Sequence, residues 1–295
     1  LMLGDPITDL TIAMEVNYFQ LNRAEYFVPV TVKIPGRELA LAKKFGNEHT
    51  VIDFVCEIKD EMGLTVSNLR DNVDVKLSDA SATELAKRPI EYSTGFTLLP
   101  GHYTIKFLAR DDETGRMGTY QGVFVIPNLS KATKQLPISS VVLSNQRVGT
   151  REALFNTMKG KEQAKNDAAN PLVNGDGKLI PSVTRTFPID RNIEVFLQAY
   201  LGNDPAGNDS SLSKEKLTAN SQVIAFVSLY RDGIKVMDSE AIQASALTES
   251  RLGTVAIDLK VGIAKLGPGE YQCQVTVLDP SRNRAAFWQG LVAVR

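Results

Sequence analysis

The sequence predicts an all-β protein made of two tandem β-sandwich domains of the immunoglobulin or fibronectin III type. Short segments alternate between apolar and polar residues, a period-two pattern that is typical of half-buried strands. Turn-forming residues separate these segments and helical periodicity is scarce, which favours a sandwich over a βαβ arrangement. A stretch in the middle of the chain also recurs near its end. The length of 295 residues corresponds to about two domains.

The first predicted domain spans residues 1–127. In the segment 51–58 the apolar residues fall on alternate positions, as expected when one face of a strand is buried. Pro100 and Gly101 suit the two central positions of a type II turn. The strand-like segments of this domain are residues 12–19, 26–34, 51–58, 73–77, 92–99, 103–109 and 120–126.

An internal repeat is the strongest signal in the sequence. Residues 98–125 align with residues 266–293 at a constant offset of 168, with eight identities in 28 positions. Because chance would give about two identities, the stretch indicates two copies of one sandwich. The identities are Leu98/Leu266, Pro100/Pro268, Gly101/Gly269, Tyr103/Tyr271, Asp111/Asp279, Arg116/Arg284, Gln121/Gln289 and Gly122/Gly290.

Two weaker matches extend the repeat upstream. Phe54-Val55 resembles Phe226-Val227, since a basic residue, an aspartate and a glycine turn follow each pair. The segment Asn192–Tyr200 can likewise take the place of Tyr26–Ile34.

The residues that the two copies share are interpreted as determinants of the fold. Tyr103 and Tyr271 match the tyrosine corner of immunoglobulin-like sandwiches, whose hydroxyl bonds back to the preceding loop. The Gln-Gly pairs 121–122 and 289–290 are expected to mark a bulge or a close backbone approach at the start of the last strand.

The second predicted domain spans residues 138–295, after a linker at 128–137. Its first strand is expected at Ile138–Leu143. Two polar stretches, at about 147–170 and 202–220, are longer than ordinary connections and are interpreted as loop excursions.

The composition excludes several classes of protein. The 33 Lys and Arg balance the 34 Asp and Glu, so no basic patch for nucleic acid is expected. No segment approaches the roughly 18 consecutive apolar residues of a membrane-spanning helix. Cys56 and Cys273 lie in strand-like segments and are expected to be buried and reduced, with a disulfide between the domains as the alternative.

Three acidic motifs could bind a metal ion. Residues Asp79-Ala80-Ser81-Ala82-Thr83 have the outline of a metal-ion-dependent adhesion site for Mg²⁺ or Ca²⁺, although a capped helical turn is the favoured interpretation. Residues Asn174-Gly175-Asp176-Gly177 resemble the middle of a calcium loop, but the acidic ligands of such a loop are replaced by Leu172 and Val183. Residues Asp111-Asp112-Glu113 could bind Ca²⁺ weakly, and a solvated turn is favoured there.

Catalytic chemistry has little support in the sequence. His49 is placed in a loop, and His102 is replaced by Glu270 in the second copy. The sequence contains no Gly-x-Ser-x-Gly motif, no phosphate-binding glycine loop and no His/Cys cluster. No catalytic, cofactor-binding or metal-binding residue and no cofactor is therefore predicted.

Several strings carry a resemblance to a known family. They are Tyr26–Gly36, Leu69–Asp71, Leu99–Tyr103, Thr114–Gly118, Pro181–Arg185 and Gly269–Val275. Together they resemble the C-terminal β-rich region of the acidobacterial von Willebrand factor A-related (VWFA-related) proteins, over nearly the whole chain. The resemblance implies an exported protein with a binding or assembly role. Because the family's metal site lies in an N-terminal von Willebrand A-type domain that these strings do not match, the resemblance carries over no site residue.

The sequence thus predicts a non-catalytic, exported module that acts through protein–protein contacts or self-assembly. Its place would be an envelope or extracellular assembly, in the periplasm, at the cell surface or outside the cell, although residues 1–6 show no signal peptide. A metal-dependent adhesin that uses the Asp79–Thr83 motif is the alternative, and a hydrolase is the third interpretation.

Overall fold

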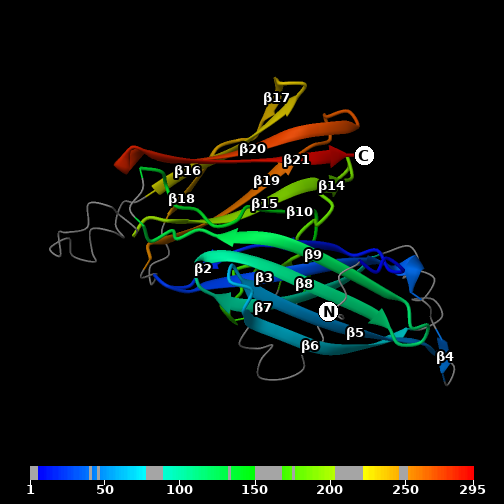
Figure 1. The fold of residues 1–295 in the computed structure, drawn as a ribbon. Coiled ribbons are helices and arrows are strands. Elements are labelled where there is room, and N and C mark those ends of the chain that lie inside the picture. The colour runs from blue at the N-terminus through cyan, green and yellow to red at the C-terminus, as the bar shows by residue number, and fades with distance from the viewer. Residues whose placement is uncertain are drawn as a thin grey trace. The chain divides into compact units, whose positions relative to one another are not determined.

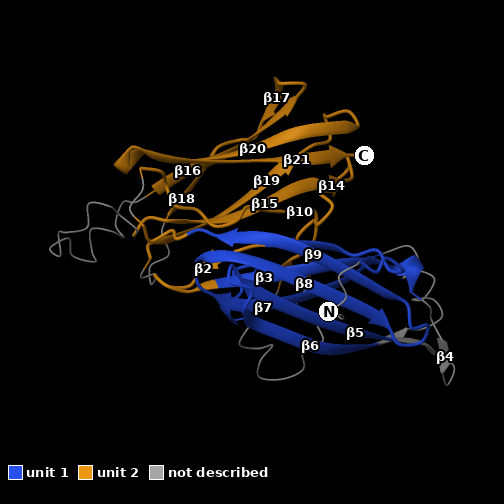
Figure 2. Cartoon of the chain, viewed as in Figure 1, with its two compact units in different colours: residues 1–16, 27–127, 149–176 blue, residues 17–26, 128–148, 177–295 orange. Residues whose placement is uncertain are grey.

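The computed structural model describes residues 6–39, 42–44, 47–77, 89–131, 134–149, 168–174, 177–202, 222–245 and 252–295. Strands dominate these residues, which confirms the all-β prediction (Figure 1). The chain splits into two compact units (Figure 2). The first unit comprises residues 1–16, 27–127 and 149–176, and the second comprises residues 17–26, 128–148 and 177–295.

The first unit contains two sheets. One sheet has the strand order β6-β5-β8-β9, in which β4 also pairs with β5. In the other sheet, β3 lies between β1 and β7. The elements are β1 (Ala13–Val16), β3 (Tyr26–Pro35), η1 (Gly36–Glu38), β4 (Ala42–Lys44), β5 (Asn47–Asp60), β6 (Thr65–Leu77), β7 (Pro89–Leu98), β8 (Gly101–Asp111), β9 (Met117–Ile126) and β12 (Val173–Asn174).

Aromatic side chains join the two sheets of the first unit. The ring of Phe54 on β5 stacks on that of Tyr92 on β7, with 4.1 Å between their centroids. Phe107 on β8 contacts both rings. The two sheets therefore pack face to face as a sandwich, as the alternating pattern of these strands predicts.

The second unit repeats this arrangement. One sheet has the order β14-β21-β20-β16, with β17 and β18 both pairing with β16, and the other has the order β10-β15-β19. The elements are β2 (Phe19–Gln20), β10 (Val142–Ser144), β11 (Arg147–Gly149), β13 (Gly177–Leu179), β14 (Thr186–Phe187), β15 (Asn192–Tyr200), β16 (Gln222–Arg231), β17 (Ile234–Asp238), β18 (Ile242–Ser245), β19 (Thr254–Gly262), β20 (Gly269–Asp279), η2 (Pro280–Arg282) and β21 (Arg284–Val294).

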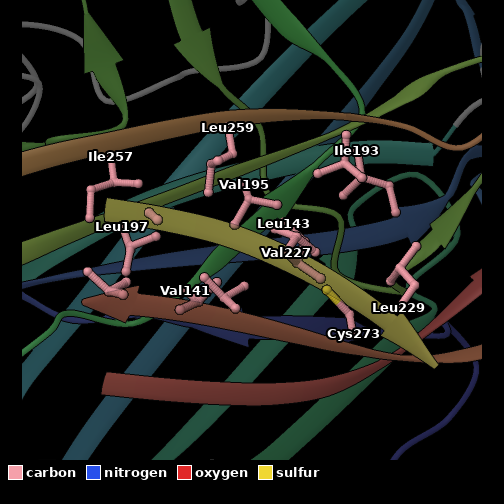
Figure 3. Packing of buried hydrophobic residues seen from close by; sticks show 14 of the residues in the cluster. Val141, Leu143, Ile193, Val195, Leu197, Val227, Leu229, Ile257, Leu259 and Cys273 are labelled. Carbon is pink, nitrogen blue, oxygen red and sulfur yellow. The ribbon is translucent and has the colours of Figure 1, made fainter. Parts of the chain in front are cut away.

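A single hydrophobic cluster fills the second sandwich. Figure 3 shows part of it, with Val195 from β15, Leu259 from β19 and Val227 from β16. All three side chains are at most 2% exposed. Because each strand contributes every second residue to this core, the intervening residues point away from it.

The internal repeat is visible in strands that correspond between the two units. The strand β8 (Gly101–Asp111) corresponds to β20 (Gly269–Asp279) at the predicted offset of 168. Both tyrosine corners form as expected, since the Tyr103 hydroxyl donates to the Leu99 carbonyl at 2.8 Å and the Tyr271 hydroxyl donates to the Gly267 carbonyl at 2.6 Å. As predicted, β15 takes the place of β3: β3 pairs with β1 and β7, and β15 pairs with β10 and β19.

The upstream match of Phe54 with Phe226 is wrong by one residue. Asp53 pairs with Arg110 on β8, whereas Ile224 pairs with Leu278 on β20, so β5 corresponds to β16 at an offset of 171. Phe54 is buried, and Phe226 lies on the opposite face of its sheet. A slip of one residue moves a side chain to the other face of a strand, and the sequence letters alone concealed that slip.

Turn chemistry also differs from the prediction at two places. Gly101 does not have the positive φ that a type II turn requires, and Gly269 has φ +151°, so each Pro-Gly pair leads directly into its strand. The two Gln-Gly pairs lie within regular pairing, with Gly122 opposite Ile105 and Gly290 opposite Cys273, and form no bulge. The close approach at Gly122 and Gly290 comes instead from an aromatic ring two residues earlier, Tyr120 or Trp288.

The long polar stretches are described in part. Residues 150–167 and 203–221 lie outside the described residues. Arg147–Gly149, expected at the start of the first polar loop, forms the strand β11. The expected strand Ile138–Leu143 is represented by an isolated bridge at Ile138 and by β10 (Val142–Ser144).

Candidate functional site

The outer face of the sheet formed by β16, β20 and β21 is the candidate site. Its residues are those that alternate with the core positions of these strands. Cross-strand pairing arranges them in rows, of which the central one is Ser228, Gln274 and Gln289. We name the following set the neutral face: Ile224, Phe226, Ser228 and Tyr230 on β16, Gln272, Gln274, Thr276 and Leu278 on β20, and Ala285, Phe287, Gln289 and Leu291 on β21.

The neutral face has no charged member, and the next outward residue of β20 beyond it is the exposed Glu270. Phe287 is 63% exposed and Leu291 is 66% exposed, although both are large hydrophobic side chains. The outward residues of a solvated antiparallel sheet are ordinarily polar. The centres of protein–protein interfaces, by contrast, are depleted of charge and enriched in aromatic residues.

A chain of amide side chains crosses the middle of the neutral face. Gln272 Nε2 donates to Gln289 Oε1 at 3.1 Å, and Gln289 Nε2 donates to Gln274 Oε1 at 2.8 Å. Gln274 Nε2 in turn donates to Thr276 Oγ1 at 3.3 Å. Each amide has two N–H donors and two acceptor lone pairs, so these linked glutamines can still form hydrogen bonds with a further partner. The hydrogen bonds also orient the amides before any partner arrives.

The equivalent face of the first unit is strongly charged. Its strands β5 and β8 place Asp53 opposite Arg110 and Glu57 opposite Lys106. The Thr65 hydroxyl donates to Glu57 Oε1 at 2.7 Å, and this bond, with Lys59 nearby, lowers the pKa of Glu57. The charged residues and their counterparts are Asp53 and Ile224, Glu57 and Ser228, Lys59 and Tyr230, Lys106 and Gln274, and Arg110 and Leu278.

Charges reappear at the margin of the neutral face on β17. Lys235 Nζ lies 2.9 Å from Asp238 Oδ2, and Ser228 Oγ donates to Asp238 Oδ1 at 2.6 Å. Hydrogen bonds from Lys235 and Ser228 lower the pKa of Asp238, and the same carboxylate raises the pKa of Lys235. The two charges thus neutralise each other beside the neutral face.

The chain itself covers both ends of the outer edge of β21. Near one end, the Leu136 amide donates to the Ala285 carbonyl at 3.1 Å. Near the other, the Ala293 amide donates to the Arg185 carbonyl at 2.9 Å, and β14 pairs with β21 in parallel. Covered edges discourage the addition of a further strand. The β21 edge is therefore partly closed to a further strand, while Phe287 and Leu291 on the face are exposed.

The predicted metal motifs fall mostly outside the described residues. This applies to the whole of Asp79–Thr83 and to the centre of the Asn174–Gly177 motif. In the third motif, the expectation of a solvated turn is wrong for Asp111, which is fully buried and accepts hydrogen bonds from the Glu113 amide and the Thr114 hydroxyl. Asp111 thus fixes the β8–β9 turn from inside. Among the described residues, no group of three or more His, Cys, Asp or Glu side chains could hold a metal ion.

The histidines and cysteines lie on strands. The placement of His49 in a loop is wrong, since it belongs to β5 and pairs with Ala42 and Lys76. His102 is an exposed residue of β8. Cys56 and Cys273 are free and buried, as expected for reduced thiols, and burial raises the pKa of each to about 12. Thiols that stay protonated at neutral pH are poor nucleophiles.

The sequence interpretation missed the neutral face because it compared the copies only where they agree. The informative positions are those where the copies differ, such as Lys106 against Gln274. Within residues 98–125 and 266–293 this signal was readable at the offset of 168. On β16 the one-residue error in alignment paired Phe226 with a core residue and hid its outward direction.

The comparisons with known proteins give only distant structural matches. No family model matches the sequence, and no curated protein matches it. Among solved structures, a β-glucuronidase of Parabacteroides merdae shares 13% identity over 95% of this chain and 28% of that chain, with a TM-score of 0.26. A β-glucuronidase of Bacteroides uniformis shares 11% identity over 39% of this chain and 13% of that chain, with a TM-score of 0.28. The C-terminal domain of the AgI/II polypeptide BspA of Streptococcus agalactiae shares 9% identity over 97% of this chain and 100% of that domain, with a TM-score of 0.21.

The similarity to these proteins is distant. The chain spans between 13% and 28% of the length of the β-glucuronidases that it matches, and what those proteins do is not transferred to it. In the described part of the chain, no helix has the length and apolar character needed to cross a bilayer.

Proposed function

We propose that this protein is a non-catalytic module that binds other protein surfaces and serves as a component of an exported assembly. The neutral face carries this proposal. A sandwich needs polar residues on its outer faces for solubility. The first unit has charged residues at the equivalent positions of β5 and β8, while its β9 exposes Val123 where β21 exposes Leu291. Keeping Phe287 and Leu291 exposed beside an ordered amide chain has a cost in solubility, which contact with a partner would offset.

An exported location is part of the same proposal. It is supported by the resemblance of several strings to the C-terminal region of the VWFA-related proteins. Export would place the chain in the periplasm, at the cell surface or outside the cell. Fractionation of the native source with an antibody against the chain tests this, and recovery only from the cytoplasm would contradict it.

Site-specific photo-crosslinking tests the binding role. A photoreactive phenylalanine analogue placed at Leu291 of the full chain, in the cells that make it, is expected to give a discrete crosslinked protein. The matched control is the same analogue at Val123, the equivalent strand position of the first unit, which is 83% exposed. Crosslinks of equal yield from both positions, or from neither, would contradict the proposal.

A further inference from the structure

The neutral face has the symmetry that contact with its own copy requires. A two-fold interface is isologous, so each group must be compatible with an identical patch rotated by half a turn. Charges of one sign would repel themselves across the axis, whereas an amide can both donate to and accept from another amide. The central row, with Gln274 and Gln289, supplies such groups at the middle of the face.

The rows on either side of the amides are apolar at their ends. One is formed by Phe226 with Phe287, and the other by Tyr230 with Leu291. A half-turn about an axis that passes beside the central row brings each apolar row against an apolar row, whether the strands of the two copies run parallel or antiparallel. Parallel strands also bring the row of Ile224 and Leu278 against itself, whereas antiparallel strands place that row against Glu270, so the parallel orientation is the one that matches every row.

We infer that the neutral face packs against the same face of a second copy of this chain, with the amides of Gln274 and Gln289 near the two-fold axis. This inference rests on the proposed binding role and names its partner. The formal net charge of −1 per chain adds little repulsion between copies. The covered ends of β21 disfavour a continuous sheet across that edge, and the exposed side chains of Phe287 and Leu291 lie on the face.

The size of the face sets the strength of the contact. The neutral face spans three strands about 4.8 Å apart and four rows about 6.8 Å apart, so its flat area is about 400 Å² per copy. A standard interface covers about 800 Å² per partner. The neutral face thus forms the core of the contact, and a rim that includes Lys235 and Asp238 on β17 completes it. We expect a reversible dimer with a dissociation constant in the range of about 1–100 μM.

Sedimentation velocity over a range of about 1–300 μM tests the inference on the full chain. The unchanged chain is expected to shift from monomer to dimer with rising concentration. Leu291→Asp, which places a charge in the apolar row, should weaken the dimer at least thirtyfold. Val123→Asp, the matched change on the first unit, should leave the dissociation constant unchanged within about twofold. Circular dichroism of both variants checks that each remains folded.

A second variant tests whether the two-fold axis of the dimer passes near Gln289. Gln289→Glu brings two like charges together in the dimer, so dimerisation should fall at pH 7 and recover below about pH 4, where the carboxyls are protonated. Gln121→Glu, at the equivalent position of β9, should show no such pH dependence.

The outcomes separate the inference from the proposed function. A monomer at about 300 μM, or a dimer that Leu291→Asp leaves intact, overturns the inference. If the crosslink from position 291 then joins the chain to a different protein, the binding role stands with another partner. If the crosslink joins two copies of this chain and the variants behave as described, both are supported.

Discussion

The outer faces of the two sandwiches occupy the same place in one scaffold and have opposite character. On β5 and β8, cross-strand pairs such as Asp53 with Arg110 combine opposite charges. On β16 and β20, the same pair is Ile224 with Leu278. Opposite-charge pairs across a sheet stabilise it slightly and keep its surface hydrated. The second unit has uncharged residues at the five equivalent positions, while both units have an apolar core and a tyrosine corner.

This difference shows which positions of a duplicated fold are constrained by folding. Inward residues must fill a close-packed core, so both copies keep apolar character there, as with Ala109 and Val277. Outward residues contact solvent, and their identity is set by what the surface meets. Positions that are charged in one copy and neutral in the other are therefore those at which the two surfaces can differ without a change of fold.

The largest loss of stability is expected from Phe54, which the sequence repeat aligned wrongly with Phe226. Phe54→Ala removes a ring that stacks on Tyr92 in the core, and should lower the free energy of unfolding by about 3–5 kcal/mol. Phe226→Ala removes a ring from the outer face and should cost about 1 kcal/mol or less. Urea denaturation measures both changes. Equal losses would mean that the two rings are equivalent and would refute the offset of 171.

The shared Asp and Arg of the β8–β9 and β20–β21 turns act differently in the two copies. Asp279 is buried and lies 3.4 Å from the guanidinium of Arg284, which is itself buried. Arg116, the counterpart of Arg284, donates to the carbonyls of Glu38 and Asp9. The same two residue types therefore form an ion pair inside one turn and anchor the chain to a distant segment in the other.

Asp279→Asn should consequently destabilise the protein more than Asp111→Asn. The substitution removes the buried carboxylate that lies 3.4 Å from the buried guanidinium of Arg284, which should cost about 3 kcal/mol. Asp111→Asn weakens hydrogen bonds to the Glu113 amide and the Thr114 hydroxyl, at about 1 kcal/mol. Thermal unfolding followed by circular dichroism compares the two. A larger loss of thermal stability for Asp111→Asn than for Asp279→Asn would contradict this prediction.

The sequence predicted the scaffold well because strand alternation, turn residues and the repeat all depend on local chemistry. Tyr103 and Tyr271 could be assigned their hydroxyl bonds from their spacing after Pro-Gly alone. Register across the sheet is not local, and the one-residue error at Phe226 followed from that. The neutral face also depends on register, since its rows combine residues of three strands that are far apart in the chain.

Alkaline pH should weaken both units alike through their buried cysteines. Burial raises the pKa of Cys56 and Cys273 to about 12, while the unfolded thiols ionise near pH 9. Stability from these groups is present below pH 9 and is lost as the pH rises, because the unfolded chain then releases protons that the folded chain keeps. By pH 9.5 the loss should be about 1 kcal/mol per thiol.

Urea denaturation at pH 7.5 and 9.5 measures this loss, and single alanine variants divide it between the units. Cys56→Ala and Cys273→Ala should each remove about 1 kcal/mol of the pH-dependent loss. A variant with unchanged pH dependence would mean that the thiol in that unit is accessible to solvent when folded.

The smallest loss of stability is expected at the tyrosine corners, and it tests whether the two corners contribute equally. Tyr103→Phe and Tyr271→Phe each remove one hydroxyl that donates to a carbonyl four residues earlier, and leave the ring in place. Each should cost about 1 kcal/mol, since a net hydrogen bond in a protein contributes that amount. The ring of Tyr271 also lies beside the Arg231 guanidinium, 5.6 Å from its centroid, and the phenylalanine variant keeps this contact. Matching losses in urea denaturation would support equivalent corners, whereas a difference of more than about 1 kcal/mol would show that one unit depends on its corner more than the other does.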